Sequence, residues 1–293
     1  MTWELRIGAV QMRSTNALDD NLRSCRELIG QAAGDGAKLV VLPECFPFLG
    51  RGEGDKLPIA EATDGNGPVM GMLRESATKH GAWIVGGGMP EIVPGDGKRT
   101  YNTCVVVNPR GELVARYRKI HLFDVDIPPE VGTDEPSAGR VARPGLGATL
   151  RESDATAAGG ERVVVDIEGA KVGLSICYDL RFPELYRELV LDRSAEVLLV
   201  PSAFTAHTGA AHWHLLLRAR AVEDQAWVVA AAQWGKHNEK RESYGHALVC
   251  DPWGTIVGER ADGDGVVVAT IDGATVAKRR AQMPVARHAT LWR

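Results

Sequence analysis

The sequence lacks the features that would place this protein in a membrane or on a nucleic acid. Apolar residues make up 44% of the 293 residues, but no apolar run approaches the roughly 20 residues that cross a bilayer. The net charge of −4 gives no basis for binding polyanions. The opening segment, MTWELRIGAVQMRSTN, has no cationic region followed by an apolar stretch, so we expect no signal peptide. These absences predict a cytoplasmic protein without membrane or nucleic-acid partners.

Cysteine is scarce and shows no pairing pattern. The five cysteines, at positions 25, 45, 104, 177 and 250, are an odd number at scattered spacing, and no CxxC pair occurs. This pattern argues against a disulfide scaffold and against a cysteine zinc site, and it fits free thiols in a reducing compartment. We expect neither a metal nor an organic cofactor.

What the sequence does contain is an alternation of short β-branched runs with helical patterns. Such alternation predicts an α/β fold with mixed sheets covered by helices. Since no stretch is long enough to act as a linker, we expect one domain over residues 1–293. The expected strands are residues 5–10, 37–44, 82–88, 171–177, 196–201 and 226–232, and the expected helices are residues 16–33, residues 66–80, and segments that begin at Pro183 and near His212.

Two further segments share a turn motif. Residues 105–114 and 247–257 each place Asn or Asp, then Pro, any residue and Gly between extended runs. Because this order suits a type I turn, both segments are predicted to be antiparallel hairpins. Residues 128–160 are rich in Pro, Gly and Ala without periodicity, so we expect mostly surface loop there.

Three polar residues stand near the carboxyl ends of apolar strands, where α/β sheets place their ligand sites. Glu44 ends LVVLPE, Lys119 follows GELVARYR, and Cys177 ends KVGLSIC. Together they could supply a base, an oxyanion stabiliser and a nucleophile. Taken singly, each has an ordinary alternative: a packing thiol, a strand-end carboxylate and a solvated basic edge.

Motifs spread over nearly the whole chain link these residues. The sequence resembles the nitrilase, or carbon–nitrogen hydrolase, superfamily, and within it the Nit-type amidase branch, which includes deaminated glutathione amidases and omega-amidases. The matching motifs are LVVLPE around Glu44, YRKIHLFD around Lys119, CYDLRFPELY from Cys177, YNT (101–103), HWHLLLRARAVEDQ (212–225), YGHALVCDPWG (244–254) and RRAQMPVARH (279–288).

The resemblance implies a four-layer αββα sandwich with two mixed sheets, which dimerises to eight layers. It also implies a catalytic Glu–Lys–Cys triad of Glu44, Lys119 and Cys177, with the backbone N–H of Tyr178 as a second oxyanion donor. A second glutamate assists in this family, and the RES sequence before the cysteine matches Glu152 better than Glu130. The extra residues then form an insertion at about 129–150, beside the site.

The implied activity is hydrolysis of a small, linear, carboxylate-bearing amide through a thioester, with release of ammonia. Two other substrate classes remain open: the 2-oxo-dicarboxylate monoamides of omega-amidases and N-carbamoyl amino acids. A non-catalytic interaction protein with the same fold is a further alternative, which the intact triad argues against.

Arg181 is the principal candidate for binding substrate, because carbamoyl-hydrolysing relatives carry an arginine at this spacing, where it resembles a carboxylate clamp. The alternative is a structural ion pair with Asp179 or Glu184, two acids that we expect to cap the helix beginning near Pro183. Other expected substrate contacts are Tyr101, Asn102 and Phe204.

The remaining motifs have weaker functional readings. HTGAAHWH (207–214) holds three histidines, but His212 and His214 are two positions apart on an expected helix and do not share a face as metal ligands would. His214 also stands where the resembling proteins often have Glu. The glycines at 86–88 lack the context of a phosphate loop, so close backbone packing is expected there.

Overall fold

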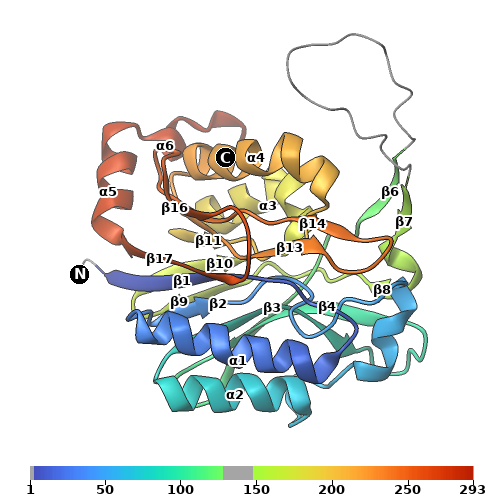
Figure 1. Ribbon diagram of the computed structural model, residues 1–293. Helices are drawn as coiled ribbons and strands as arrows, with labels where there is room; N and C mark the ends of the chain where they lie inside the picture. The colour runs from blue at the N-terminus through green and yellow to red at the C-terminus, as the bar shows by residue number, and fades with distance from the viewer. Residues whose placement is uncertain (1–2, 128–147, 293) are drawn as a thin grey trace.

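The structure is a computed structural model, which describes residues 3–127 and 148–292. Two β-sheets lie face to face, with α1 and α2 on the outer face of one sheet and α3 and α4 on the outer face of the other (Figure 1). This arrangement confirms the predicted four-layer αββα sandwich. Both sheets contain parallel and antiparallel pairs, so the prediction of mixed sheets is also confirmed.

The first sheet has β1 at its centre. In the path β14-β13-β1-β2-β3-β4-β5, the neighbours β1–β2, β2–β3 and β1–β13 are parallel, while β17 pairs with β1 and β8 with β4. Its strands are β1 (Glu4–Met12), β2 (Leu39–Val41), β3 (Trp83–Ile92), β4 (Thr100–Val107), β5 (Leu113–Arg118), β8 (Thr156–Ala157), β13 (Ala232–Lys236), β14 (Glu242–Tyr244) and β17 (Gly265–Asp272).

The second sheet follows the order β16-β15-β12-β11-β10-β9, and a separate two-stranded ribbon joins β6 to β7. Its inner strands β10, β11 and β12 are parallel. The strands are β9 (Val164–Ile167), β10 (Ala170–Leu174), β11 (Val197–Leu199), β12 (Trp227–Ala230), β15 (Ala247–Cys250) and β16 (Ile256–Arg260), and the ribbon is β6 (Asp124–Ile127) with β7 (Ala148–Arg151).

The helices surround these sheets. In the described part of the chain, no helix combines the length and apolarity that a membrane span requires. The α-helices are α1 (Leu18–Gly34), α2 (Pro68–His80), α3 (Pro183–Arg187), α4 (Ala206–Asp224), α5 (Gly273–Gln282) and α6 (Val285–His288), and the shorter turns are η1 (Glu53–Ile59), η2 (Glu152–Asp154), η3 (Cys177–Arg181), η4 (Glu188–Asp192) and η5 (Thr290–Trp292).

The buried strands have apolar side chains on both faces, because each sheet is covered on both sides. In β2, Leu39 and Val41 point into the core between the sheets, whereas Val40 packs in the cluster beneath α1 and α2. Successive strand residues face opposite ways, so one short run serves two cores. This double burial explains why the strands read as continuous hydrophobic runs.

Both predicted hairpins are confirmed, as β4–β5 and β15–β16. In the first turn, Gly111 donates its N–H to the carbonyl of Asn108 at 2.8 Å and has a φ of +78°. In the second, Gly254 donates to Asp251 at 2.9 Å and has a φ of +84°. The fourth turn position therefore needs glycine, as the sequence motif indicates.

Two expectations about elements were wrong, and a third falls partly outside the described residues. Residues 226–232 form two strands, because the chain passes from β12 in the second sheet to β13 in the first. Helix α4 begins at Ala206, six residues before His212. Its first turns pack against Tyr244 at Gly209, where any Cβ would lie 2.3 Å from Tyr244 Cβ, so glycine is required there for packing. Within the loop expected over residues 128–160, residues 148–157 hold β7, η2 and β8. Residues 128–147, which include most of the insertion expected at about 129–150, lie outside the described residues.

The glycines at 86–88 pack closely, as expected. A Cβ on Gly87 would lie 2.1 Å from the Leu42 carbonyl oxygen and 2.3 Å from Pro201 Cβ. Pro201 stands just after β11 of the second sheet. Because neither a carbonyl nor a proline ring can swing away, the sheets would have to separate to admit a methyl group.

We therefore expect Gly87→Ala to lower the free energy of unfolding by about 1–3 kcal/mol, the usual cost of overpacking. Gly71→Ala in α2 is the matched control, because a Cβ there meets nothing within 4 Å. It should raise the free energy of unfolding by roughly 0.5–1 kcal/mol, since glycine weakens a helix interior. Urea unfolding measures both, and a Gly87→Ala variant as stable as the parent would contradict the close packing.

Candidate active site

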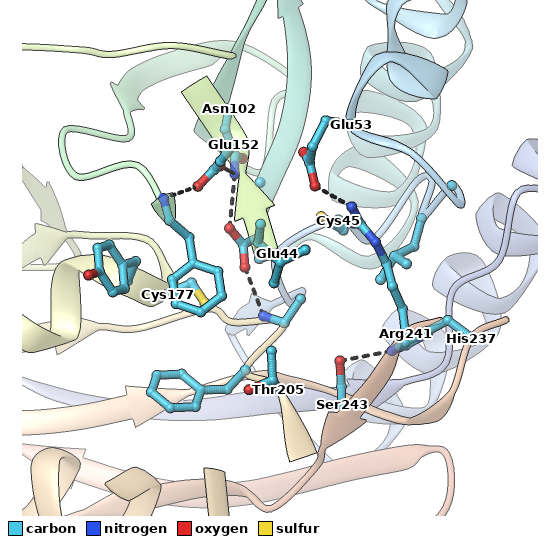
Figure 2. Close-up of a pocket in the computed structure, with 18 of the residues that line it drawn as sticks. Glu44, Cys45, Glu53, Asn102, Glu152, Cys177, Thr205, His237, Arg241 and Ser243 are labelled. Atoms are coloured by element: carbon cyan, nitrogen blue, oxygen red, sulfur yellow. Dashed lines mark hydrogen bonds and ion pairs between the residues drawn. The ribbon is translucent and has the colours of Figure 1, made fainter. Parts of the chain in front are cut away.

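Four of the residues singled out from the sequence lie together in one pocket of about 360 Å³ (Figure 2). Glu44 follows β2, Lys119 follows β5, Glu152 opens η2 after β7, and Cys177 opens η3 after β10. Each stands just beyond a strand, so the ends of both sheets supply the site. The β6–β7 ribbon brings Glu152 to a group that is distant in sequence.

The centre of this group is a buried ammonium between two carboxylates. Lys119 Nζ lies 2.9 Å from Glu44 Oε1 and 2.9 Å from Glu152 Oε2, and its side chain is only 2% exposed. Backbone donors also hold the carboxylates, with Ala203 N–H at 2.8 Å from Glu44 Oε2 and Phe123 N–H at 2.7 Å from Glu152 Oε2. We refer to Glu44, Lys119 and Glu152 as the ion cluster.

Lys119 and Glu152 remain charged despite their burial. Burial on its own would lower the pKa of Lys119, but attraction to Glu152 and Glu44 outweighs it and holds the pKa well above the ordinary value. Burial likewise acts to raise the pKa of Glu152, and Lys119 reverses this, so the pKa is lowered. The site thus contains a fixed positive charge at neutral pH.

Asn102 joins the two glutamates. Its side-chain amide donates to Glu44 Oε1 at 2.9 Å and to Glu152 Oε1 at 3.4 Å. Gly88 makes room for this arrangement, because a Cβ there would lie 2.8 Å from Asn102 Oδ1 and 3.1 Å from the Glu44 Cα. Asn102 lines the pocket as the sequence led us to expect, and it also orients both carboxylates.

Cys177 sits at a sharp turn. The strand ends at Leu174, and Cys177 has a φ of +49°, a conformation that is uncommon outside glycine. Its N–H donates to the Pro201 carbonyl at 3.0 Å. Burial, followed by repulsion from Glu44, raises the pKa of the Cys177 thiol well above its ordinary value, although Lys119 acts in the opposite direction. The resting group is therefore the neutral thiol.

Asp179 anchors this turn, and our expectation that it caps α3 was wrong. Its Oδ2 accepts from the Ile176 N–H at 2.9 Å and from the Tyr117 hydroxyl at 2.6 Å, and its Oδ1 lies 2.7 Å from His121 Nδ1. Asp179 is fully buried, and no side chain caps α3 at Phe182. The carboxylate instead ties the Cys177 turn to the segment that carries Lys119.

Arg181 lines the pocket, and among the described residues it forms no ion pair with Asp179 or Glu184. Asp179 is occupied as described, whereas the Arg181 guanidinium lies 5.1 Å from the Phe204 ring centroid and 5.9 Å from that of Tyr178. Its Nη1 lies 3.3 Å from His212 Nδ1. Phe204 also lines the pocket, as does Tyr101, whose ring lies 4.1 Å from the Arg118 guanidinium carbon.

A second charged group at the pocket was missed by the sequence analysis. Glu53 forms ion pairs with Arg241 and, at 3.2 Å, with Lys56, and all three residues line the pocket (Figure 2). Lys56 Nζ also lies 2.6 Å from the Thr156 hydroxyl. Since Lys56 and Arg241 belong to segments far apart in the chain with no motif around either, only the folded structure brings them together.

His237 is bonded to this second group, because its backbone N–H donates to the Arg241 carbonyl at 2.9 Å, and its ring is neutral. Its Nδ1 lies 2.8 Å from the Ser14 carbonyl oxygen, which can only accept, so Nδ1 carries the proton. The other ring nitrogen then accepts from the Ser243 hydroxyl, also at 2.8 Å. Burial lowers the pKa of His237 to about 4, which keeps the ring uncharged at neutral pH.

The fold and this site define the class of the protein. A model of the carbon-nitrogen hydrolase family matches residues 6–281, and the chain belongs to this family. Its activity is that of an amidase, as its relatives show. A mouse protein named deaminated glutathione amidase is 42% identical over 291 residues, covering 98% of this chain and 84% of the relative.

Two further comparisons agree with this assignment. A Dictyostelium discoideum protein of the same name is 40% identical over 290 residues, covering 98% of this chain and 94% of the relative. A solved Saccharomyces cerevisiae structure, described as a member of branch 10 of the nitrilase superfamily, superposes with a TM-score of 0.81 at 30% identity. It covers 96% of this chain and 95% of the other.

Glu130, the alternative to Glu152 in the sequence, lies outside the described residues.

The direction of the Cys177 pKa shift leads to a prediction about alkylation. Only the thiolate reacts with iodoacetamide, so a raised pKa makes labelling slow at neutral pH and faster as the pH rises. Glu44→Gln removes the carboxylate that repels the thiolate and leaves Lys119 in place, so the pKa should fall. Labelling at pH 7 should then be faster, by about tenfold for each unit of pKa.

The rate is measured against pH, with the labelled residue located by mass spectrometry and Cys177→Ala as the control. Slower labelling of Glu44→Gln at every pH would show that Glu44 activates the resting thiol.

Proposed function

We propose that this protein hydrolyses small, linear, carboxylate-bearing amides of the deaminated glutathione type through a thioester on Cys177. The observation that carries the proposal is the ion cluster opening onto Cys177 in a pocket whose wall presents Arg181. A thiol, a carboxylate that contacts it and a fixed cation are the groups that acyl transfer requires.

In the first half of the reaction, Glu44 takes the Cys177 proton as sulfur attacks the amide carbon. Lys119 Nζ contacts one oxygen of Glu44, at 2.9 Å, and both oxygens of Glu152, at 2.9 and 3.1 Å. When one N–H is shared between the two Glu152 oxygens, the third N–H turns to the developing oxyanion. The Tyr178 backbone N–H serves as the second oxyanion donor. Losing one such donor costs about 2.7–4 kcal/mol in other enzymes.

The tetrahedral intermediate collapses when the protonated Glu44 gives its proton to the leaving nitrogen. The C–N bond breaks and a thioester remains on Cys177. Glu44 then deprotonates water, which attacks the thioester carbon, and the returning proton restores the thiol. Glu152 keeps Lys119 charged throughout, so each proton transfer runs through Glu44. No metal or organic cofactor enters this sequence.

The identity of the leaving group separates the substrate classes. A deaminated glutathione has secondary amides, so its cleavage releases a peptide amine, whereas a primary monoamide or a carbamoyl compound releases ammonia. Both classes fit the proposed chemistry, and the names of the relatives favour the first. An assay must therefore follow free amine as well as ammonia.

The cellular location, the number of domains and the oligomeric state are also proposed. The five free cysteines support a cytoplasmic location, because thiols stay reduced there. The match of one family model to residues 6–281 supports a single domain. An eight-layer homodimer stays a prediction of the resemblance. Leu215 and Val222 on α4 support it, because they are 67% and 49% exposed and lie one heptad apart on one helix face, with Trp253 at 54% exposed beyond them.

The function is tested with a panel of deaminated glutathione, 2-oxo-dicarboxylate monoamides, N-carbamoyl amino acids and simple aliphatic amides. We expect turnover that is greatest on the first and is abolished in Cys177→Ala, whose circular dichroism and melting temperature should match the parent. Accumulation of an acyl-enzyme adduct in mass spectra should be lost as well. Turnover by folded Cys177→Ala would refute the nucleophile, and silence across the panel without thiol trapping would favour a binding role.

Arg181 gives a separate prediction about specificity. A guanidinium can bind a substrate carboxylate with two parallel hydrogen bonds, which fixes the amide carbon against the thiol. Arg181→Lys keeps the charge but loses this geometry, so KM should rise on carboxylate-bearing amides while neutral amides are unaffected. Arg181→Ala should be worse on the acidic substrates.

The comparison of acidic and neutral substrates provides its own control. Equal losses on both substrate types, accompanied by a lower melting temperature, would show that Arg181 holds the η3 turn and does not bind the substrate.

A further inference from the structure

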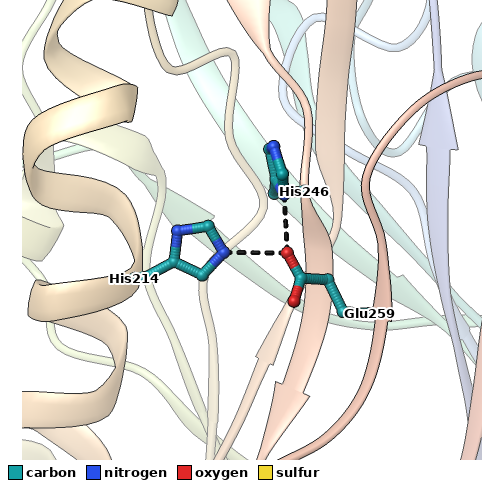
Figure 3. A group of neighbouring side chains, drawn as sticks. All are labelled: His214, His246 and Glu259. Carbon is teal, nitrogen blue, oxygen red and sulfur yellow. Dashed lines mark hydrogen bonds and ion pairs between the residues drawn. The ribbon is translucent and has the colours of Figure 1, made fainter. Parts of the chain in front are cut away.

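We propose that His214, His246 and Glu259 form a binding site for one transition-metal ion of the zinc class. Figure 3 shows the two imidazoles directed at the same carboxylate from different segments. His214 lies on α4, His246 immediately precedes β15, and Glu259 lies on β16. The site is separate from the pocket that contains the ion cluster.

The ligand atoms already converge. His214 Nε2 lies 2.8 Å from Glu259 Oε1, His246 Nδ1 lies 2.6 Å from the same oxygen, and the three atoms lie within 4.8 Å of one another. Around a tetrahedral zinc with bonds of about 2.0–2.2 Å, ligand atoms are about 3.3 Å apart. An ion therefore requires the carboxylate oxygen to withdraw by about 0.6 Å, which side-chain rotation provides.

The most constrained of the three residues is His246. It has a φ of +60°, and its carbonyl accepts the Trp213 indole N–H at 2.8 Å. Its ring stacks on Tyr244, with centroids 4.3 Å apart and planes at 24°. Trp213 directly precedes His214, so the same helix turn fixes the backbone of one ligand and carries another. This arrangement pre-organises the site before an ion arrives.

The set of ligands selects the class of metal. Two imidazoles and one carboxylate are the protein ligands of many zinc sites that keep one position open for water. The three side chains are 24–32% exposed, so solvent can reach the ion. Imidazole suits zinc, cobalt, nickel and copper, whereas magnesium and calcium prefer all-oxygen sites.

The sequence alone gives no sign of this site, because His212 and His214 are two positions apart and do not share a helix face. The structure instead joins His214 to two residues that are distant in the chain. A histidine–glutamate–histidine hydrogen-bonded clasp without an ion is the competing interpretation.

Binding would have a structural consequence for the active site. Helix α4 begins with residues that line the pocket, among them His207 and Thr208, two turns before His214. An ion held between α4 and the β15–β16 hairpin would restrain that wall. We therefore expect saturating zinc to raise the melting temperature, by about 4 °C at a hundredfold excess over Kd.

The test uses tag-free Cys177→Ala protein, because a pocket thiolate would compete for metal. Cobalt is titrated and its visible absorption recorded, and zinc is then measured by displacement of cobalt. We expect one ion per chain, a spectrum without thiolate-to-cobalt charge transfer, and no response to magnesium or calcium.

Glu259→Gln is the decisive variant, because the amide keeps a hydrogen-bond acceptor for the histidines but removes the anionic ligand. Affinity should fall at least about 100-fold in this variant and in His246→Gln, since even the loss of an outer-shell partner costs about 10–100-fold. His212→Gln is the matched control on the same helix and should bind as the parent does. Undiminished affinity in folded Glu259→Gln, or no saturable binding in the parent, would overturn the proposal in favour of the clasp.

Discussion

The site depends on one buried interaction, the ion pairing of Lys119 with Glu44 and Glu152. An ammonium that is 2% exposed has lost its water, and only opposite charges with good geometry can replace that hydration. Removing either carboxylate would leave a poorly compensated charge, whereas removing the lysine would leave two carboxylates in mutual repulsion. Such clusters are weak sources of stability, because desolvation cancels most of the attraction. In this protein the cluster fixes a positive charge and a base next to a thiol.

Keeping those charges in place sets demands on the fold. Glu44 requires β2 and β3 to lie close, which Gly88 permits, and Glu152 requires the β6–β7 ribbon to return to the body of the protein. A third buried acid, Asp179, holds the segment after Lys119 against the turn that carries Cys177. Glu44 and Glu152 therefore meet one end of residues 119–121, and Asp179 meets the other. Residues 119–121 thus connect Lys119, the proposed oxyanion donor, to the turn of Cys177, the proposed nucleophile.

The sequence was sufficient where structure follows from local chemistry or from a matched motif. The Asn-Pro-x-Gly and Asp-Pro-x-Gly turns predicted both hairpins, and the motifs around Glu44, Lys119 and Cys177 predicted residues that the fold brings together. It was insufficient where packing overrides local preference. Gly209 and the threonines near it disfavour a helix, yet α4 begins at Ala206 because Tyr244 covers the glycine. Asp179 reads as a helix cap, and only the fold reveals Tyr117 and His121 as its partners. The Glu53–Arg241 pair has no sequence signal, since nothing near either residue indicates the other.

The state of the thiol follows from the same electrostatics and bears on how the proposed reaction is controlled. The Glu44 carboxylate favours the neutral thiol, and Lys119 favours the thiolate. As long as Glu44 is ionised, the thiol stays protonated and reacts slowly with adventitious electrophiles. When an amide carbonyl enters the pocket, proton transfer to Glu44 removes the repulsion at the moment the sulfur becomes an anion. The charge lost from Glu44 and the charge gained at the substrate oxygen both lie beside Lys119. The net charge around the ammonium therefore changes little along the reaction, which keeps the cost of reorganising a buried site small.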